Sequence, residues 1–515
     1  MRYFLLALCI LLSINPTNAY TDVDNTAAVQ FIHSHFEKSP ATKATKTLRN
    51  ISLEQALFEF YAARGNAPAW HNAHLVEQLF NELDNLRDDG LDPEDYHLSE
   101  LHQHFMQLRS NELDAKQMAD FDILASTAYL RSLTHLFRGK VNPTTLDPQW
   151  NFALHDMAIS DAIKIVSEAI EKNDLHRAYE RARPQFPPYL RTRIALAKLR
   201  AVAEHGGWPH LDGKETLKPG AITSDVITLR KRLLPDTVDN PQADVYDDEL
   251  VAAVKKFQRE QYLTVDGVVG QATRSALNVP IHQRIDQVRV NLERGRWQFH
   301  EVHGNFVLVD IAGYKIYFFN DEKIVWKSQV QVGRPLRQTP VFQAKITYVT
   351  FNPTWTVPPT ILRKDILPEV RKKIGYLAKN NIRVFDTRGR ELDPNTIDWN
   401  NPGDIVLRQN AGDDAALGQV AIRFPNPYSV YLHDTPHREL FDDSQRAFSS
   451  GCIRVERPLE LVELLFNDPV NWNRAAIEAF IAKGETRNVN LPKPVPILLD
   501  YWTIDLLDDG TIGFK

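Results

Sequence analysis

The uneven distribution of glycine constrains the fold of this chain more than any other feature. The protein has 515 residues and 22 glycines, but its first 205 residues contain only Gly65, Gly90 and Gly139. A long stretch with so few turn-forming glycines is typical of helices. A Ser52–Gln55 capping box predicts a helix start, and Gly206-Gly207 fits the end of a helix over 190–204. We therefore predict a helical scaffold domain over residues 20–215, without a catalytic cluster.

Residues 216–280 are predicted to form a small second domain. Leu250, Val251, Val254 and Phe257 recur at helical spacing, so they share one apolar helix face. Asp266-Gly267 is a turn signal, and a short helix is expected after it.

From Phe306 onward the sequence acquires strand character. Its β-branched and aromatic runs are broken at 312–313 and 320–321, which predicts consecutive hairpins. Further strands are expected at 345–351, 420–424 and 429–433, and a helix is expected to begin at Pro458. The whole chain is thus predicted to be a multidomain α+β protein. Its mainly-β domain would span 281–490, with a C-terminal extension over 491–515.

The N-terminus has the order of a secretory signal. Met1-Arg2 is followed by an apolar run over 3–14 and a small-residue cleavage site at Thr17-Asn18-Ala19. The run is shorter than the roughly 20 residues of a membrane-spanning helix. We predict a signal peptide over 1–19 and a secreted mature chain, with an uncleaved anchor as the alternative. Any membrane contact would be through that segment.

The net charge is −6 and the isoelectric point is near 6.3, which argues against nucleic acid as a partner. Two histidine-containing stretches, 33–35 and 100–104, are interpreted as solvated helix surface. No metal site is expected there.

Cysteine usage points to one residue. The chain has only Cys9 and Cys452, and signal cleavage would remove Cys9. A lone thiol in an oxidising compartment is exposed to oxidation, so secreted proteins normally pair their cysteines. A buried, inert cysteine would explain Cys452 as well as a nucleophile would, and composition does not separate the two.

Two segments near Cys452 could form a thiol site. Residues 431–434 read Tyr-Leu-His-Asp at the end of a predicted strand, and 448–454 read Phe-Ser-Ser-Gly-Cys-Ile-Arg. A thiol needs a neighbouring base or cation to become a thiolate, and histidine titrates in the right range. Backbone N–H groups around Gly451 and Cys452 could hold an oxyanion. Spacing alone is weak support for His433, because the chain has 17 histidines and His437 lies nearer to the cysteine.

Two resemblances favour the functional interpretation. The stretch FQREQYLTVDGVVGQATRSALN resembles the peptidoglycan-binding domain that accompanies many wall enzymes. His433 followed by Ser449-Ser450-Gly451-Cys452-Ile453-Arg454 resembles the signature of the L,D-transpeptidase catalytic domain. Upstream, Val332-Gly333 and Gln338-Thr339-Pro340 match the same family. The complete chain is similar to the large, three-part members found in Gram-negative bacteria.

The match has two departures. Ser450 stands where many members have histidine, so His433 would be the sole base. Asp434 stands where many have glycine, so the group that orients His433 would be either Asp434 or a backbone carbonyl.

An insertion is predicted at about 353–412, because Thr339 and His433 are farther apart than is usual in the family. It is too long for an ordinary loop. It would be either a tolerated surface insertion or a lid that keeps water from a thioester.

The resemblance implies the following function. Cys452 would attack the third residue of a tetrapeptide stem, release D-Ala with His433 as acid and base, and pass the acyl group to a neighbouring stem in a 3→3 cross-link. Gly451, Ser450 and Cys452 would supply the oxyanion hole. No cofactor or metal is expected, and carbapenems should acylate the thiol. Supporting or substrate-binding residues would be Asp434, Tyr431, Arg454, Arg423 and Ser449.

The implied partners are donor and acceptor stem peptides of peptidoglycan, with other wall-synthesis proteins as further candidates. The implied location is the periplasm of a Gram-negative bacterium. Two alternatives stay open: a cysteine endopeptidase of the wall, and a non-catalytic wall-binding scaffold protein in which Cys452 is inert.

Overall fold

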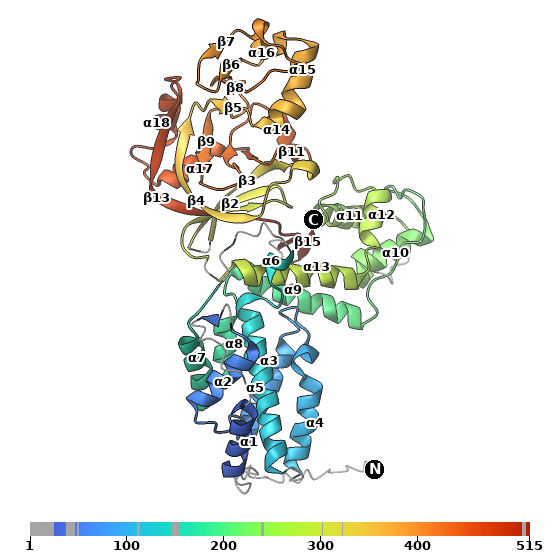
Figure 1. Cartoon of the computed structure of the whole chain (residues 1–515). Coiled ribbons are helices and arrows are strands. Elements are labelled where there is room, and N and C mark those ends of the chain that lie inside the picture. The colour runs from blue at the N-terminus through green and yellow to red at the C-terminus, as the bar shows by residue number, and fades with distance from the viewer. Residues whose placement is uncertain are drawn as a thin grey trace. The chain divides into compact units, whose positions relative to one another are not determined.

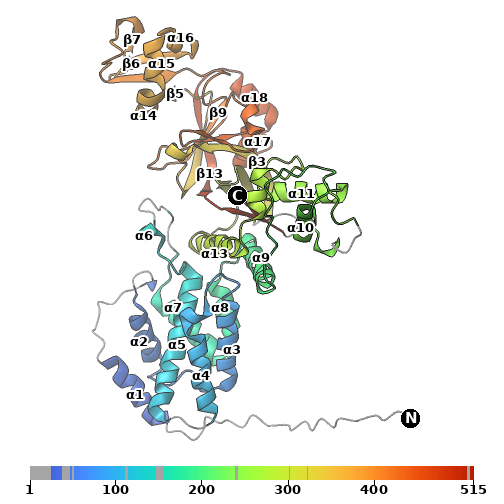
Figure 2. The same ribbon diagram turned by 90° about the vertical axis from the view of Figure 1, so that its right-hand side faces the viewer.

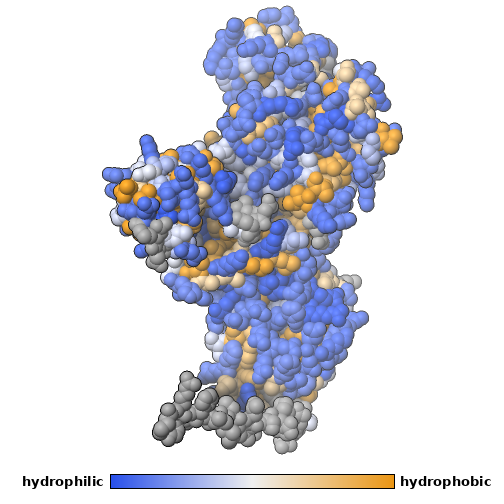
Figure 3. Space-filling model, turned by 180° about the vertical axis from the view of Figure 1, so that it is seen from behind, coloured by the Kyte–Doolittle hydropathy of each residue, from blue (hydrophilic) through white to orange (hydrophobic). Residues whose placement is uncertain are grey.

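A computed structural model describes residues 25–37, 47–48, 51–110, 114–146, 152, 155–237, 242–300, 302–321, 323–506 and 511–515. The predicted signal peptide and Cys9 lie outside these ranges. Within them, no helix is both long and apolar enough to cross a membrane. The face shown in Figure 3 is mostly hydrophilic, with separate apolar patches.

The chain divides into two compact units. The first comprises Met1–Asn142, Leu154–Gln185 and Leu292–His300, and the second comprises Pro143–Ala153, Phe186–Asn291 and Glu301–Lys515. As the glycine distribution predicts, the N-terminal part is helical and the C-terminal part is rich in strands.

The first unit is a helical bundle around α5 (Figure 1). Ser52 caps α2 by accepting a hydrogen bond from the Gln55 N–H at 3.2 Å. The helices of this unit are α1 (Asn25–Glu37), α2 (Leu53–Ala63), α3 (Ala73–Asn85), η2 (Pro93–Tyr96), α4 (Leu98–Arg109), α5 (Ala115–Arg138), α7 (Ile159–Glu171) and α8 (Leu175–Ala182).

The predicted boundaries of the scaffold domain differ from those of the helical unit. The expected domain ended at residue 215, whereas the unit ends at Gln185 and takes up 292–300. Phe186, just past that end, packs on Phe306 and Phe319 of the second unit, with ring centroids 6.1 and 5.6 Å apart. The helix α13 (Ile281–Gln298) begins at the predicted start of the mainly-β domain, but its last turns carry Arg296, which donates to the Asp89 carbonyl at 2.6 Å. Helical periodicity cannot show which unit a helix packs against.

The small predicted domain has its own core. It contains α10 (Ser224–Leu233), η3 (Pro235–Thr237), α11 (Asp248–Glu260) and α12 (Gln271–Leu277), preceded by α6 (Pro143–Leu146) and α9 (Pro187–Glu204) in the same unit. Gln258 is 1% exposed, and its side chain binds the backbone of the 266–268 turn. Gly267 has φ +75°, and a Cβ there would press on Val251 and Lys255. The Phe-Gln and Asp-Gly pairs therefore hold the fold of this domain together.

The main sheet has nine strands in the order β11-β3-β12-β10-β9-β4-β13-β1-β2. Because β2 also pairs with β3, the strands other than β11 close into a ring. Its core includes α17 (Pro458–Phe466), which starts at the predicted proline, and α18 (Arg474–Ile481). The strands are β1 (Phe306–Asp310), β2 (Lys315–Asn320), β3 (Lys323–Gly333), β4 (Phe342–Phe351), β9 (Val420–Arg423), β10 (Leu432–His433), β11 (Ala447–Ser449), β12 (Ile453–Val455) and β13 (Arg487–Asp500).

Two predictions about these strands need correction. The C-terminal extension was expected to begin at 491, but β13 runs through that point and pairs with both β4 and β1. The strand expected at 429–433 shortens to β10. Ser429 has φ +57°, and Asn426 binds the backbone of Tyr428 and Val430, so this stretch is a turn.

The predicted insertion forms a small sheet with a core of its own. Its strands make a four-stranded sheet, β5-β8-β6-β7, over an apolar core that includes Val384 and Leu407. Figure 2 shows these elements gathered together. They are β5 (Trp355–Thr356), α14 (Pro359–Ile361), the π-helical turn η5 (Leu362–Ile366), α15 (Leu367–Lys372), α16 (Gly375–Lys379), β6 (Ile382–Asp386), β7 (Glu391–Leu392), η6 (Pro394–Thr396) and β8 (Ile405–Gln409). The remaining elements are η4 (Pro335–Arg337), η7 (Glu439–Phe441), β14 (Ile504–Leu506) and β15 (Ile512–Phe514).

Candidate active site

The side chains singled out by the sequence lie on three neighbouring strands. The short strands β10 and β12 are parallel, with Leu432 opposite Ile453 and His433 opposite Arg454. Leu432 and Ile453 are fully buried in the core of the sheet. Because successive side chains of a strand point to opposite faces, those of Tyr431, His433, Cys452 and Arg454 share the other face.

The antiparallel strand β9 adds Arg423 to this face. Leu432 is opposite Ile422, so Arg423 falls opposite Tyr431. The Arg423 guanidinium lies 3.9 Å from the centre of the Tyr431 ring, a cation–π contact. We call this set of five residues (Arg423, Tyr431, His433, Cys452 and Arg454) the thiol face.

Cys452 is a free, partly buried thiol. Its Sγ–H donates to the Ser429 carbonyl at 3.7 Å. Burial raises the pKa of the Cys452 thiol, and the Tyr431 backbone N–H and the charge of Arg423 oppose that rise without cancelling it. The resting sulfur is therefore a neutral thiol.

His433 is 4% exposed, and its tautomer is fixed by its own neighbour. Nδ1 lies 2.5 Å from the Asp434 carbonyl, which can only accept, so Nδ1 carries the proton and Nε2 presents a lone pair. Burial, and then the Arg454 charge, lower the pKa of His433 to about 3. The imidazole is thus neutral, with an unprotonated Nε2.

Of the two orienting groups considered for His433, the structure places the backbone carbonyl of Asp434 on the imidazole. The Asp434 carboxylate points elsewhere, accepting from the Gln419 N–H at 3.0 Å and from Arg438 at 3.1 Å. A Cβ on Gly418, where φ is +56°, would lie 2.4 Å from that carboxylate. The glycine thus makes room for this anchor.

Arg454 has a buried donor without a partner. Its Nη1 donates to the Gln331 side chain on β3 at 3.1 Å, whereas its Nε is buried without a hydrogen-bond partner in the described part of the chain. An unpaired N–H in a buried guanidinium is costly unless a ligand satisfies it.

The loop before Cys452 is tightly bonded. Ser449 Oγ donates to the Cys452 carbonyl at 2.5 Å and accepts from the Gly451 N–H at 3.1 Å. The Gly451 N–H, expected among the oxyanion donors, is thus engaged within the loop in this conformation. Gly451 has φ +119°, which a side chain would strain. Ser450 Oγ accepts from Arg337 at 2.9 Å.

Sequence reasoning missed four contributors to this site: Ser429, Gln331, Thr339 and Arg337. Thr339 was noted only as part of a family match, yet its Oγ1 donates to the Gly451 carbonyl at 2.9 Å. Asn426-Pro427 is a turn signal that could have located the Ser429 carbonyl. Nothing in the sequence marks Gln331, because it reaches Arg454 from a strand 123 residues earlier.

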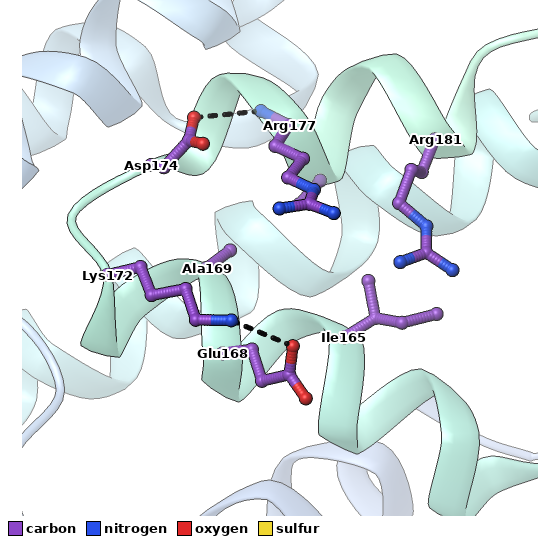
Figure 4. Close-up of a pocket in the computed structure, with 8 residues that line it drawn as sticks. Ile165, Glu168, Ala169, Lys172, Asp174, Arg177 and Arg181 are labelled. Atoms are coloured by element: carbon purple, nitrogen blue, oxygen red, sulfur yellow. Dashed lines mark hydrogen bonds and ion pairs between the residues drawn. The ribbon is translucent and has the colours of Figure 1, made fainter.

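A depression between α7 and α8 of the helical unit lacks the nucleophile and base candidates of the thiol face (Figure 4). Lys172 pairs with Glu168 at 3.3 Å, and Asp174 caps the Arg177 N–H at 3.2 Å. Its lining holds no thiol or imidazole. Among the residues that the structure describes, no group of three or more His, Cys, Asp or Glu side chains is placed to hold a metal ion.

Comparisons with known proteins identify three domains. Residues 55–196 match a family described as "Scaffold domain", 223–277 match "Putative peptidoglycan binding domain", and 304–471 match "L,D-transpeptidase catalytic domain". A Haemophilus influenzae protein named "Putative L,D-transpeptidase" is 33% identical over 211 residues. That match covers 40% of this chain and 42% of the relative's length.

Solved structures of L,D-transpeptidases are more distant. The Enterococcus faecium enzyme is 9% identical, with 43% of this chain and 65% of that one covered at a TM-score of 0.19. The Mycobacterium smegmatis enzyme is 15% identical, with 38% and 58% covered at 0.17. Such scores carry no structural argument, so the family matches and the relative decide the assignment. The chain carries an L,D-transpeptidase catalytic domain, from a family of cysteine enzymes, together with a scaffold domain and a peptidoglycan-binding domain.

Proposed function

We propose that this protein forms 3→3 cross-links in peptidoglycan through an acyl-enzyme on Cys452. The observation that carries the proposal is the thiol face, where a neutral thiol and a histidine of fixed tautomer project from paired strands. The donor would be a tetrapeptide stem and the acceptor the side-chain amine of a neighbouring stem.

The first half-reaction would form a thioester. Cys452 Sγ attacks the carbonyl carbon of the third stem residue while His433 Nε2 takes the thiol proton. The bond to D-Ala then breaks, and His433 returns the proton to the leaving amine. The free Nε–H of Arg454 is a candidate donor to the substrate, and Arg423 adds positive charge nearby.

The second half-reaction would transfer the acyl group. The acceptor amine attacks the thioester carbon, His433 takes a proton from it, and the sulfur leaves as a thiolate that recovers a proton from His433. Water would compete with the amine. We propose that the 353–412 insertion is a lid that limits this competition.

The domain content supports a location in the periplasm and stem peptides as the substrate class. The peptidoglycan-binding domain would bring the catalytic domain to its polymeric substrate, and the helical scaffold could serve other wall-synthesis proteins. The acceptor could also be a lipoprotein or a free D-amino acid, which product analysis would distinguish.

The test is muropeptide profiling of cells carrying the wild type or Cys452→Ala. New 3→3 dimers that depend on Cys452 are expected, whereas loss of existing dimers would indicate an endopeptidase. Intact-mass measurement after incubation with a carbapenem tests the thiol directly. One adduct at Cys452 is expected, and its complete absence would leave only a non-catalytic wall-binding role.

A further inference from the structure

A short segment before β4 is bonded to the nucleophile loop at two points. The Arg334 N–H donates to the Ser449 carbonyl at 3.1 Å. Thr339 Oγ1 donates to the Gly451 carbonyl while accepting from the Gly333 N–H, both at 2.9 Å. A Cβ on Gly333 would lie 2.2 Å from the carbonyl oxygen at the far side of the turn, so the turn closes only with glycine. Residues 333–339, which we call the bridging turn, are therefore hydrogen-bonded to the loop that carries Cys452.

The side chain of Arg337 extends from the bridging turn in two directions. It donates to Ser450 Oγ at 2.9 Å, directly before Gly451-Cys452. It also forms a two-pronged ion pair with Asp365 of the insertion, one arm of which is 3.1 Å long. Arg334 approaches the same carboxylate at 3.4 Å. One guanidinium thus joins the insertion to the nucleophile loop.

This pair differs from an ordinary surface ion pair, which contributes little to stability. The Arg337 side chain is only 15% exposed and makes a fork-to-fork contact. The hydrogen bond from Arg337 lowers the pKa of Asp365, so the carboxylate stays charged. Asp365 also lies in the π-helical turn η5, a geometry that is rare and often found at functional sites.

We propose that Arg337 is a positioning residue that couples the place of the insertion to the conformation of the nucleophile loop. With the Asp365 pair formed, Ser450 is held and the insertion stays over the loop. When the pair breaks, Ser450 loses its donor and the insertion is released. This inference rests on the proposed function for its catalytic consequence, but the coupling itself concerns only the thiol and the insertion.

Two reaction rates of Cys452, which should change in opposite directions, test the coupling. The first is the rate of Cys452 alkylation by iodoacetamide, followed by peptide mass, which reports access to the sulfur. The second is the rate of Cys452 acylation by a carbapenem, followed by intact mass, which requires an ordered site. Arg337→Gln and Asp365→Asn should each raise the alkylation rate about threefold and lower the acylation rate about tenfold. The tenfold change lies within the roughly 5- to 150-fold range that is typical of coupling between two sites.

The double variant decides between coupling and independent effects. Arg337→Gln combined with Asp365→Asn should be no slower in acylation than either single variant, because both break the same link. Arg383→Gln is the matched control: it removes another arginine–carboxylate pair within the insertion, with Glu391, and should leave both rates unchanged. A variant that merely misfolds would lose acylation with a lowered melting temperature.

Additive effects, or an Asp365→Asn variant with wild-type rates, would overturn the proposal. If the wild type itself forms no carbapenem adduct, the proposed function fails. The alkylation rates would still support or overturn the coupling in that case.

Discussion

The polar cluster around Asp122 in the helical unit and the thiol face of the catalytic domain both bury polar groups, but they satisfy them differently. In the bundle, Asp122 is 3% exposed and accepts from the Tyr61 hydroxyl at 2.6 Å and from the backbone N–H groups of Ala69 and Trp70. On the thiol face, His433 Nε2 presents a lone pair and Arg454 Nε has no partner among the described residues. A fully bonded polar cluster stabilises the fold, whereas groups left open are available to a substrate.

Substituting His433 should separate chemistry from stability most strongly. His433→Gln removes the proposed base, so acylation by a carbapenem should slow about a thousandfold. Intact-mass time courses would measure this rate. The melting temperature at neutral pH should change little, because the imidazole is neutral there and the glutamine amide can also donate a hydrogen bond. A variant that acylates within tenfold of the wild type would show that His433 is not the base.

Asp122 provides the converse experiment in the bundle. Asp122→Ala leaves the buried N–H groups of Ala69 and Trp70 without their acceptor and removes one partner of the Tyr61 hydroxyl, which should lower the free energy of unfolding by about 3 kcal/mol. Urea denaturation followed by circular dichroism would measure the loss. Asp122→Asn, which retains one acceptor oxygen, is the milder control. The acylation rate of Cys452 should stay unchanged well below the melting temperature, and a tenfold fall would mean that this cluster also serves the active site.

The pH dependence of the thiol gives a smaller effect. Because the pKa of Cys452 is raised, alkylation should keep increasing as the pH rises beyond 9, without a plateau near neutrality. Arg454→Gln removes a cation that favours the thiolate, so alkylation at pH 8 should slow about fivefold. A plateau below pH 8 in the wild type would instead indicate a thiolate–imidazolium pair.

Acid should destabilise the bundle slightly through His300. Burial lowers the pKa of His300 to about 3, whereas the unfolded chain titrates near 6.5. The unfolded state therefore binds more protons as the pH falls from about 6.5 toward 3, and stability is lost over that window. Between pH 7.5 and 5.5 this group should cost about 1.4 kcal/mol. Chemical denaturation of His300→Gln should show a correspondingly smaller loss, and an equal loss would assign the effect to other groups.

The sequence predicted the secondary structure and the families of the domains better than it predicted the domain boundaries. The glycine-poor region is helical, the hairpins after Phe306 are present, and the domain resemblances are confirmed by the family matches. The predicted limit at 215 differs from the compact units because α9 belongs to the second unit. The limit at 280 differs because α13 contributes to both units, and the limit at 490 because β13 continues across it. Local patterns reveal an apolar face, but they do not reveal what it packs against.

For the proposed site, the sequence by itself identified the candidate groups: the thiol of Cys452, the imidazole of His433 and the glycine directly before Cys452. Such residues are identified by type and by neighbours along the chain. Only the tertiary structure decided that the Asp434 carbonyl orients His433, that Gln331 binds Arg454, and that Arg337 links Ser450 to Asp365. These contacts join strands and turns that are far apart in sequence, so strand register and packing, rather than local propensity, bring them together.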